Sequence, residues 1–271
     1  MKQNILVTGA SSGFGLLLAT ELHKKGYHVI GTSRNPEHLQ SEVPFKMLEL
    51  DITDDDSIQS FGKRLFSEID KLDVLINNAG FYLSGLAEET SIEQGKQQLE
   101  TNFWGTIKLT NLILPHFRKQ RSGKIITLSS IMGLISLPGG AYYAASKHAL
   151  EGYFRALRFE LNEFNIKVSM VEPVGFKTNI VTNSKVAENK ISDYHKYRTT
   201  LEDYTRDLFT KSEEPTAVVK TLLKLVESNN PKFNHPVGKG STLFPAIQYF
   251  SFKTFEKSVI KNINKFNSTK K

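Results

Sequence analysis

The chain has 271 residues, of which 39% are hydrophobic and 23% charged, an ordinary composition for one globular domain with a sizeable core. It has no cysteine, which excludes disulfides, thiolate catalysis and cysteine-ligated metals, and none of its seven histidines has another four residues away, so we expect no metal site. The net charge of +7 lies largely in the last twenty residues without a nucleic-acid recognition motif, which disfavours nucleic-acid binding.

The N-terminal residues lead directly into a strand pattern without an apolar signal core. No run of about 18 apolar residues occurs anywhere in the chain. We therefore expect a soluble, cytoplasmic protein, in which the glycosylation sequon at Asn267 is a chance match.

The first predicted element is a buried strand at residues 4–7, followed by a glycine turn and a helical pattern that ends near Gly26. The glycines of the turn stand at positions 9, 13 and 15, not at the G-x-G-x-x-G spacing, but their physical task is similar. Gly9 turns the chain tightly, while Gly13 and Gly15 let the backbone approach a pyrophosphate and pack on the sheet. The helix N-terminus then faces the anion. The segment therefore predicts a dinucleotide-binding site.

The end of the second strand, residues 27–32, predicts which dinucleotide binds. A carboxylate there would favour a free ribose 2′-hydroxyl and an arginine a 2′-phosphate. This chain has Ser33 and Arg34, with no acidic residue from 27 to 36. We therefore predict NADP(H) rather than NAD(H), with Arg34, Ser33 and Ser11 at the phosphate. The alternative is that Arg34 is only a solvated side chain at a strand end.

Two further strands end in residues suited to a cofactor. The third strand ends at Asp51, which could accept a hydrogen bond from an adenine amino group or cap the next helix, a task for which we prefer Asp54, Asp55 and Asp56. The strand at 73–76 ends in NNAG, residues 77–80, whose small side chains leave room for a ligand at the carboxyl end of a sheet. Within it, Asn77 could equally serve only to link neighbouring strands.

The most informative stretch is Tyr143-Ala-Ala-Ser-Lys147, on a helix predicted to run to about residue 164. A spacing of four places the phenol and the ammonium on one helix face. A fixed cation favours the phenolate, so Tyr143 could exchange a proton with a substrate oxygen. Because such pairs also arise by chance, this interpretation depends on the surrounding motifs.

Two groups of polar residues that precede this pair in the sequence are candidates for the same site. A long helix predicted at 91–114 carries Asn102 in its middle, where the amide competes for the backbone, so we expect a functional explanation. The fifth strand, 124–128, leads into Ser129 and Ser130. Asn102 and Ser130 are therefore candidate site residues.

The alternation of short apolar strands with helices predicts an α/β fold. We expect a doubly wound parallel sheet of the Rossmann type, with right-handed crossovers and helices on both faces, in a single domain. Residues 1–240 form the expected dinucleotide-binding and catalytic domain. Its polar segment 179–214 follows the sixth strand and is interpreted as a lid over the substrate. A helix at 215–228 and an edge strand at 234–238 complete it.

The remaining residues, 241–271, predict a basic amphipathic C-terminal extension, in which apolar side chains stand among lysines. Such a helix could rest on a membrane surface. We favour the alternative, in which it docks on its own domain or on a neighbouring subunit.

Taken together, these positions resemble the short-chain dehydrogenase/reductase family, in its Tyr-x-x-x-Lys group. The resemblance covers about residues 3–240 and is nearest in appearance to steroid and retinol dehydrogenases and related bacterial reductases. Each motif is weak alone, but their joint order and spacing are specific. The motifs are TGASSGFG at 8–15, Asp51, NNAG at 77–80, Asn102, Ser130 and YAASK at 143–147.

The resemblance implies roles for the catalytic residues. Tyr143 would protonate a carbonyl oxygen or deprotonate an alcohol, and Lys147 would bias it towards ionisation and hold the nicotinamide ribose. Ser130 would hydrogen-bond the substrate oxygen, and Asn102 would help to hold a water near Lys147. The implied cofactor-binding residues are Gly9, Ser11, Ser12, Gly13, Phe14, Gly15, Ser33, Arg34, Asp51, Ile52, Asn78, Ala79, Gly80, Tyr143, Lys147, Pro173, Val174 and Thr178.

One departure from the family pattern is Val174, which stands between Pro173 and Gly175 where Pro-Gly is usual. Its bulk would narrow the pocket near the nicotinamide, while Thr178 would still meet the carboxamide. The expected pocket walls are mostly apolar, which suits a hydrophobic ketone or alcohol. They are Phe81, Tyr82, Met132, Leu134, Leu137, Tyr142, Val174 and Phe176.

These observations predict an NADP-dependent oxidoreductase that interconverts a carbonyl and an alcohol by hydride transfer. The alternative from another class is a non-catalytic dinucleotide-binding sensor or structural protein, against which the joint presence of Ser130, Tyr143 and Lys147 argues. A nucleotide-sugar epimerase or dehydratase is disfavoured by the glycine spacing and the short C-terminal region. The family also implies a homodimer or homotetramer, paired through the helices that carry Asn102 and Tyr143.

Overall fold

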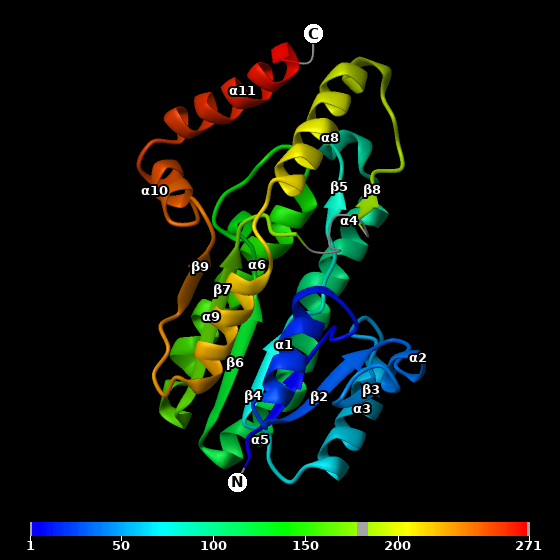
Figure 1. Ribbon diagram of the computed structural model, residues 1–271, viewed down its shortest axis with the longest axis vertical. Helices are drawn as coiled ribbons and strands as arrows, with labels where there is room; N and C mark the ends of the chain where they lie inside the picture. Colours follow the sequence, from blue (N-terminus) through cyan, green and yellow to red (C-terminus); the bar gives the residue numbers. More distant parts are fainter. Residues whose placement is uncertain (1, 178–183, 270–271) are drawn as a thin grey trace.

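The computed structural model describes residues 2–177 and 184–269, and a parallel β-sheet forms its centre (Figure 1). The strands of this sheet are β1 (Asn4–Val7), β2 (His28–Ser33), β3 (Lys46–Glu49), β4 (Val74–Asn77), β6 (Gly123–Leu128), β7 (Ile166–Pro173) and β9 (Asn234–Val237). Their spatial order is β3-β2-β1-β4-β6-β7-β9, and every neighbouring pair is parallel. The predicted doubly wound α/β sheet is confirmed.

Helices cover both faces of this sheet. The α-helices of the described residues are α1 (Gly13–Lys24), α2 (Glu37–Gln40), α3 (Asp55–Glu68), α4 (Ile92–Leu99), α5 (Thr106–Gln120), α6 (Ala141–Glu160), α8 (His195–Thr210), α9 (Thr216–Glu227), α10 (Leu243–Phe250) and α11 (Phe252–Thr269). Alternate strand residues point to opposite faces of a sheet. Leu6 and Leu75 accordingly pack with α3, α5 and α6, whereas Ile5 and Ile76 pack with α1 and α9.

The strand order reverses between β1 and β4, because β2 and β3 lie on one side of β1 and the later strands on the other. In open α/β sheets, ligands bind outside the carboxyl ends of the strands at such a reversal. The loops that follow β1 and β4 are tied together there. Asn78 donates through its side-chain amide to the Thr8 carbonyl at 2.8 Å, and its backbone N–H donates to the Thr8 hydroxyl at 2.9 Å.

The helix predicted at 91–114 is neither continuous nor confined to that range. A π-helical turn, Glu100–Gly105, separates α4 from α5 and contains Asn102. Such turns insert a residue into a helix and are frequent at functional sites. Gly105 lets this turn approach the loop after β3, since a Cβ there would lie 2.4 Å from the Ile52 carbonyl oxygen.

The C-terminal part of the chain closes the end of the molecule beyond the carboxyl ends of the strands (Figure 1). Of the predicted lid, the structure describes residues 184–214, which contain β8 (Lys185–Val186), paired with β5 (Leu83–Ser84), and the long helix α8. The extension forms two helices, α10 and α11, and α11 packs against α8. Within the two described ranges, no helix combines the length and hydropathy that crossing a bilayer requires.

Candidate active site

A cavity of about 1500 Å³ lies at the carboxyl ends of the strands, larger than the roughly 300–1,000 Å³ of an ordinary small-molecule site. It extends from the glycine turn after β1, past the ends of β2, β3 and β4, to the face of α6 that carries Tyr143 and Lys147. From there it continues to α8, α10 and α11. One continuous space therefore contains both the predicted cofactor residues and the predicted substrate residues.

The turn after β1 has a backbone conformation and a close packing that favour glycine over residues with a Cβ. Gly9 and Gly13 have φ angles of 65° and 55°, in the left-handed region that favours glycine. A Cβ on Gly15 would lie 2.4 Å from both the Gly9 carbonyl oxygen and the Asn78 amide nitrogen. Gly15 therefore does not line the cavity but lets α1 pack beneath the turn. Because α1 begins at Gly13, which does line the cavity, its N-terminus is placed to receive an anion.

Arg34 and Asp51 border the predicted adenosine end of the cavity, where Arg34 is exposed. One carboxylate oxygen of Asp51 accepts from the backbone N–H and the hydroxyl of Thr53, at 2.9 and 2.7 Å. Burial opposes ionisation, but these hydrogen bonds and the charge of Arg34 lower the pKa of Asp51 below its usual value. Asp54 caps α3 by accepting from the Ser57 N–H, so the capping alternative for Asp51 is wrong.

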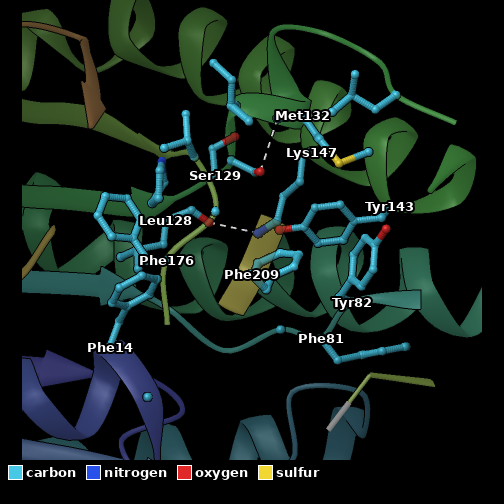
Figure 2. A pocket seen from close by; sticks show the side chains of 18 of the residues that line it. Phe14, Phe81, Tyr82, Leu128, Ser129, Met132, Tyr143, Lys147, Phe176 and Phe209 are labelled. Carbon is cyan, nitrogen blue, oxygen red and sulfur yellow. Dashed lines mark hydrogen bonds between the residues drawn. The ribbon is translucent and has the colours of Figure 1, made fainter. Parts of the chain in front are cut away.

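Tyr143 and Lys147 point into the middle of the cavity from one face of α6 (Figure 2). Each side chain is only 6% exposed. The Lys147 ammonium donates to the Leu128 carbonyl at the end of β6, at 2.9 Å, and lies 5.7 Å from the centre of the Tyr143 ring. The Tyr82 ring packs edge-on against Tyr143, with 4.8 Å between ring centres. Thus β6 fixes the ammonium and Tyr82 fixes the phenol.

Burial governs the proton affinities of this pair. Burial raises the pKa of Tyr143 to about 12, although hydrogen bonding with Ser130 opposes the rise. It lowers the pKa of Lys147 to about 8, although the charge of Glu151 opposes the fall. Desolvation and not the Lys147 charge dominates the pKa of Tyr143 here, and the expected bias of Tyr143 towards ionisation by Lys147 stays a prediction. Near neutral pH both groups hold their protons.

Ser130 and Asn102, the other two candidates, differ in position. Ser130 lines the cavity at the end of β6, and its hydroxyl oxygen accepts from the Met132 N–H at 3.1 Å. Asn102 is 1% exposed and lies behind the cavity wall. Its amide oxygen accepts from the Phe81 N–H, and its NH2 group donates to the Phe81 carbonyl and the Ser146 hydroxyl. Asn102 therefore positions the loop after β4, and its contact with a water stays a prediction.

Sequence reasoning missed two buried carboxyl groups on α6 and β7. Asn234 donates to Glu172 at 2.6 Å and to Glu151 at 3.3 Å, and the His235 N–H donates to Glu172 at 2.8 Å. Burial, and then the charge of Glu151, raise the pKa of Glu172 to about 8, and burial also raises the pKa of Glu151. The sequence did contain one signal for Glu151: its spacing of four residues from Lys147 places it one helical turn further along the same face of α6.

The half of the cavity that is predicted to hold the substrate is mostly apolar. Leu134 and Tyr142 were expected there but do not line it, because Tyr142 instead packs against Gly95, where a Cβ would lie 2.3 Å from its ring. The expected walls that do line it are Phe81, Tyr82, Met132, Leu137, Val174 and Phe176. Further walls come from α8, α10 and α11, and sequence reasoning did not name them. They are Leu201, Tyr204, Leu208, Phe209, Phe244, Ile247, Phe255, Val259 and Ile263.

Most residues predicted to bind the cofactor meet around this one cavity. The exceptions are Gly15, which packs behind the turn, and Thr178, which lies outside the described residues. The residues that line the cavity are Gly9, Ser11, Ser12, Gly13, Phe14, Ser33, Arg34, Asp51, Ile52, Asn78, Ala79, Gly80, Tyr143, Lys147, Pro173 and Val174.

Comparison with known proteins defines the class. The family model for short-chain dehydrogenases matches residues 3–189, more than half of the chain. The match includes the glycine turn, the NNAG loop and the Tyr143–Lys147 pair, and the sheet order is that of a doubly wound fold. The protein belongs to the short-chain dehydrogenase family and is an oxidoreductase of that class.

Its similarity to individual members spans nearly the whole chain. The 3-ketodihydrosphingosine reductase of Bacteroides thetaiotaomicron is 38% identical over 244 residues, which cover 87% of this chain and 88% of that protein. Retinol dehydrogenase 8 of Homo sapiens is 33% identical over 249 residues, covering 84% of this chain and 79% of that protein. A solved structure of ElxO with NADP bound is 29% identical with a TM-score of 0.76, covering 89% and 99% of the two chains. The resemblance to retinol dehydrogenases and bacterial reductases is confirmed.

Proposed function

We propose that this protein is an NADP(H)-dependent carbonyl reductase that interconverts a carbonyl and an alcohol on an apolar substrate. The proposal rests on the single cavity that Arg34, Ser130, Tyr143 and Lys147 share with the glycine turn. The dinucleotide supplies the hydride when bound. The turn and the N-terminus of α1 would hold its pyrophosphate, and Arg34 its 2′-phosphate. The similarity to ElxO, whose structure contains NADP, supports this choice of cofactor.

In the proposed mechanism, the chain's own residues manage the substrate oxygen and its proton. Because the Ser130 hydroxyl oxygen already accepts from the Met132 N–H, its hydrogen is left to donate to the carbonyl oxygen. Tyr143 transfers its phenolic proton to the same oxygen as the alcohol forms. Lys147, held by the Leu128 carbonyl, then stabilises the tyrosinate that remains. Oxidation of an alcohol follows the same path in reverse.

Long-chain ketones are the substrates that the cavity favours. Apolar side chains of α8, α10 and α11 extend the cavity well beyond Tyr143, which gives an alkyl chain a surface to bury. The Bacteroides relative carries the name of such a compound, 3-ketodihydrosphingosine. We propose 3-keto sphingoid bases and simpler long-chain ketones as the first substrates to test.

The deciding experiment follows NADPH consumption by the purified protein with a series of ketones of increasing chain length. We expect turnover with a KM that falls as the chain lengthens. Tyr143→Phe, which keeps the ring against Tyr82, should lower kcat by about 100-fold or more and leave the affinity for NADPH nearly unchanged. Tight NADPH binding without turnover in either direction would instead favour the non-catalytic sensor.

We also propose a cytoplasmic homodimer or homotetramer that pairs through α4, α5 and α6. Trp104, in the turn before α5, and Phe159, near the end of α6, are 49% and 77% exposed, which suits an interface. Sedimentation of the intact protein and of a Trp104→Ser, Phe159→Ser variant tests this assembly. A monomeric wild type, or a variant that remains fully assembled, would contradict the pairing surface.

A further inference from the structure

Helices α10 and α11 have an inner face that belongs to the cavity. Phe255 and Ile263 are 6% and 4% exposed, and both line the cavity together with Ile247 and Val259. Ring contact between Phe266 and Tyr204 joins α11 to α8. The two helices are thus docked on their own chain, as favoured from the sequence, and they form part of the wall of the substrate site.

The outer side of the same two helices is unusually apolar. Tyr249 and Phe250 are 85% and 84% exposed, and Phe252 is 62% exposed. Together they form a patch, here called the apolar edge, at the end of α10 and the start of α11, and the rings of Tyr249 and Phe250 are in contact. Isolated exposed apolar residues are normal on a soluble protein, but a contiguous aromatic group marks an interaction surface.

A stripe of positive charge continues from the apolar edge along α11. Lys253, Lys257, Lys261 and Lys265 recur every four residues and therefore share one side of the helix. Ile260, 52% exposed, lies among the last three of these lysines. Residues 239–271 contain seven lysines and one glutamate, so this short segment carries +6 of the net charge of +7.

We propose that the apolar edge and the lysine stripe dock the protein on an anionic lipid bilayer. Exposed aromatics beside a basic helix face are the combination that holds a helix in the interface of such a membrane without crossing it. The charge decides between occupants: a second copy of the chain would bring lysine stripe against lysine stripe, whereas anionic headgroups complement it. Because the inner face of the same helices lines the cavity, docking would place the substrate site beside the lipid.

This docking surface rests on the proposed function, because a bilayer is a reservoir of long-chain substrates. The test, however, measures binding of the protein to vesicles and does not depend on turnover. The full chain is sedimented with phosphatidylcholine vesicles and with vesicles that also contain phosphatidylglycerol. We expect at least about tenfold more binding to the anionic vesicles, weakened by added salt. Failure to bind either kind of vesicle would overturn the proposal.

Variants localise the effect. A Tyr249→Ser, Phe250→Ser variant and a Lys257→Glu, Lys261→Glu variant change residues outside the cavity wall, so reduction of a short soluble ketone should not change. Both should lose roughly tenfold or more of the vesicle binding. The matched control, Lys63→Glu with Lys119→Glu, makes the same change of charge on exposed residues of α3 and α5 and should bind like the wild type.

Three outcomes distinguish membrane docking from non-specific charge attraction, from dimerisation and from the reductase function. If the control loses as much vesicle binding as the α11 variant, the attraction is not specific to α11 and the docking surface is wrong. If the aromatic variant dissociates a dimer while vesicle binding persists, the docking surface is also wrong. If anionic vesicles bind as expected but no ketone is ever reduced, the docking surface stands and the reductase function fails.

Discussion

The proton affinities of Tyr143 and Lys147 stand in an order that suits reduction. With the pKa of Tyr143 raised to about 12 and that of Lys147 lowered to about 8, Lys147 loses its proton first as the pH rises. A neutral amine cannot stabilise the tyrosinate that proton donation leaves behind. The proposed carbonyl reduction would therefore depend on the ammonium form of Lys147.

The first prediction concerns this titration. We expect kcat/KM for ketone reduction to be level below pH 8 and to fall above it, approaching roughly tenfold per pH unit. Glu151→Gln should move the fall to lower pH, because the charge of Glu151 raises the pKa of Lys147. Steady-state rates at fixed ionic strength provide the measurement. A flat profile well above pH 8 would exclude Lys147 as the controlling group.

Glu172 leads to a prediction about stability. Its pKa is about 8 in the folded protein against an ordinary 4.5, so between these values only the unfolded chain ionises. The contribution of Glu172 to the free energy of unfolding is fully present below 4.5 and is lost as the pH rises through 8. Thermal unfolding of the wild type and Glu172→Gln should therefore diverge across this range, with the Tm of the variant falling less. Parallel curves would mean that Glu172 is ionised in the fold.

Arg34 carries the predicted choice of cofactor. Loss of a charge-assisted contact to the 2′-phosphate in Arg34→Ala should raise the Kd for NADPH roughly tenfold or more and leave the Kd for NADH nearly unchanged. Arg118→Ala, at an exposed position of α5, is the matched control and should alter neither value. Titration of intrinsic fluorescence measures both constants. Equal weakening of both cofactors would show that Arg34 does not contact the 2′-phosphate.

Among the helices and strands, features that depend on local sequence pattern could be predicted, whereas those that depend on long-range packing could not. The strands of the central sheet were evident because each is a short apolar run that ends in a polar or glycine-rich loop, as at 74–77, whereas the two-residue strands β5 and β8 were not. The Tyr143–Lys147 pair was evident because its chemistry demands a fixed spacing. The π-helical turn around Asn102 was not, since one inserted residue barely disturbs helical periodicity. Nor could the pattern of α11 show which surface Phe255 and Ile263 would cover.

A buried ion pair attaches the first turn of α8 to the loop that follows β5. Arg198 of α8, 14% exposed at its side chain, pairs with Glu89, which is 1% exposed and lies in the short helical turn Ala87–Glu89. The same Glu89 oxygen accepts from the Ile191 N–H at 2.9 Å. Glu89 thus binds both Ile191, just before α8, and Arg198, in the first turn of α8, to the loop that follows β5.

Arg198→Met should release this attachment, because a buried carboxylate left without its cation costs on the order of 3–5 kcal/mol. We expect a lower Tm and a higher KM for long-chain ketones, with the Kd for NADPH unchanged. Adding Glu89→Gln should recover most of the loss, since the amide oxygen can still accept from the Ile191 N–H. If Arg198→Met left the Tm and the KM at their wild-type values, α8 would be held by other contacts.

For the molecule as a whole, the last two helices, which end the sequence, complete the wall of the cavity proposed to bind the substrate. Truncation after Thr242 removes Phe255 and Ile263 from the cavity wall. A substrate alkyl chain loses about 0.8 kcal/mol for each CH2 that these side chains no longer cover, so the KM for long-chain ketones should rise roughly tenfold or more. Turnover of short ketones and the Kd for NADPH should persist, which also verifies folding. Unchanged handling of long ketones would show that α10 and α11 do not contact the substrate.

The two ends of the described chain lie at opposite extremes of the molecule, with residue 2 beyond the amino ends of the strands and residue 269 beside α8 (Figure 1). A purification handle fused to the C-terminal end would follow α11, one of the helices that wall the cavity. One fused before residue 1 would leave them uncovered. A sensor chip that captures the protein by its N-terminal end would therefore present the cavity mouth, α10 and α11 to the solution.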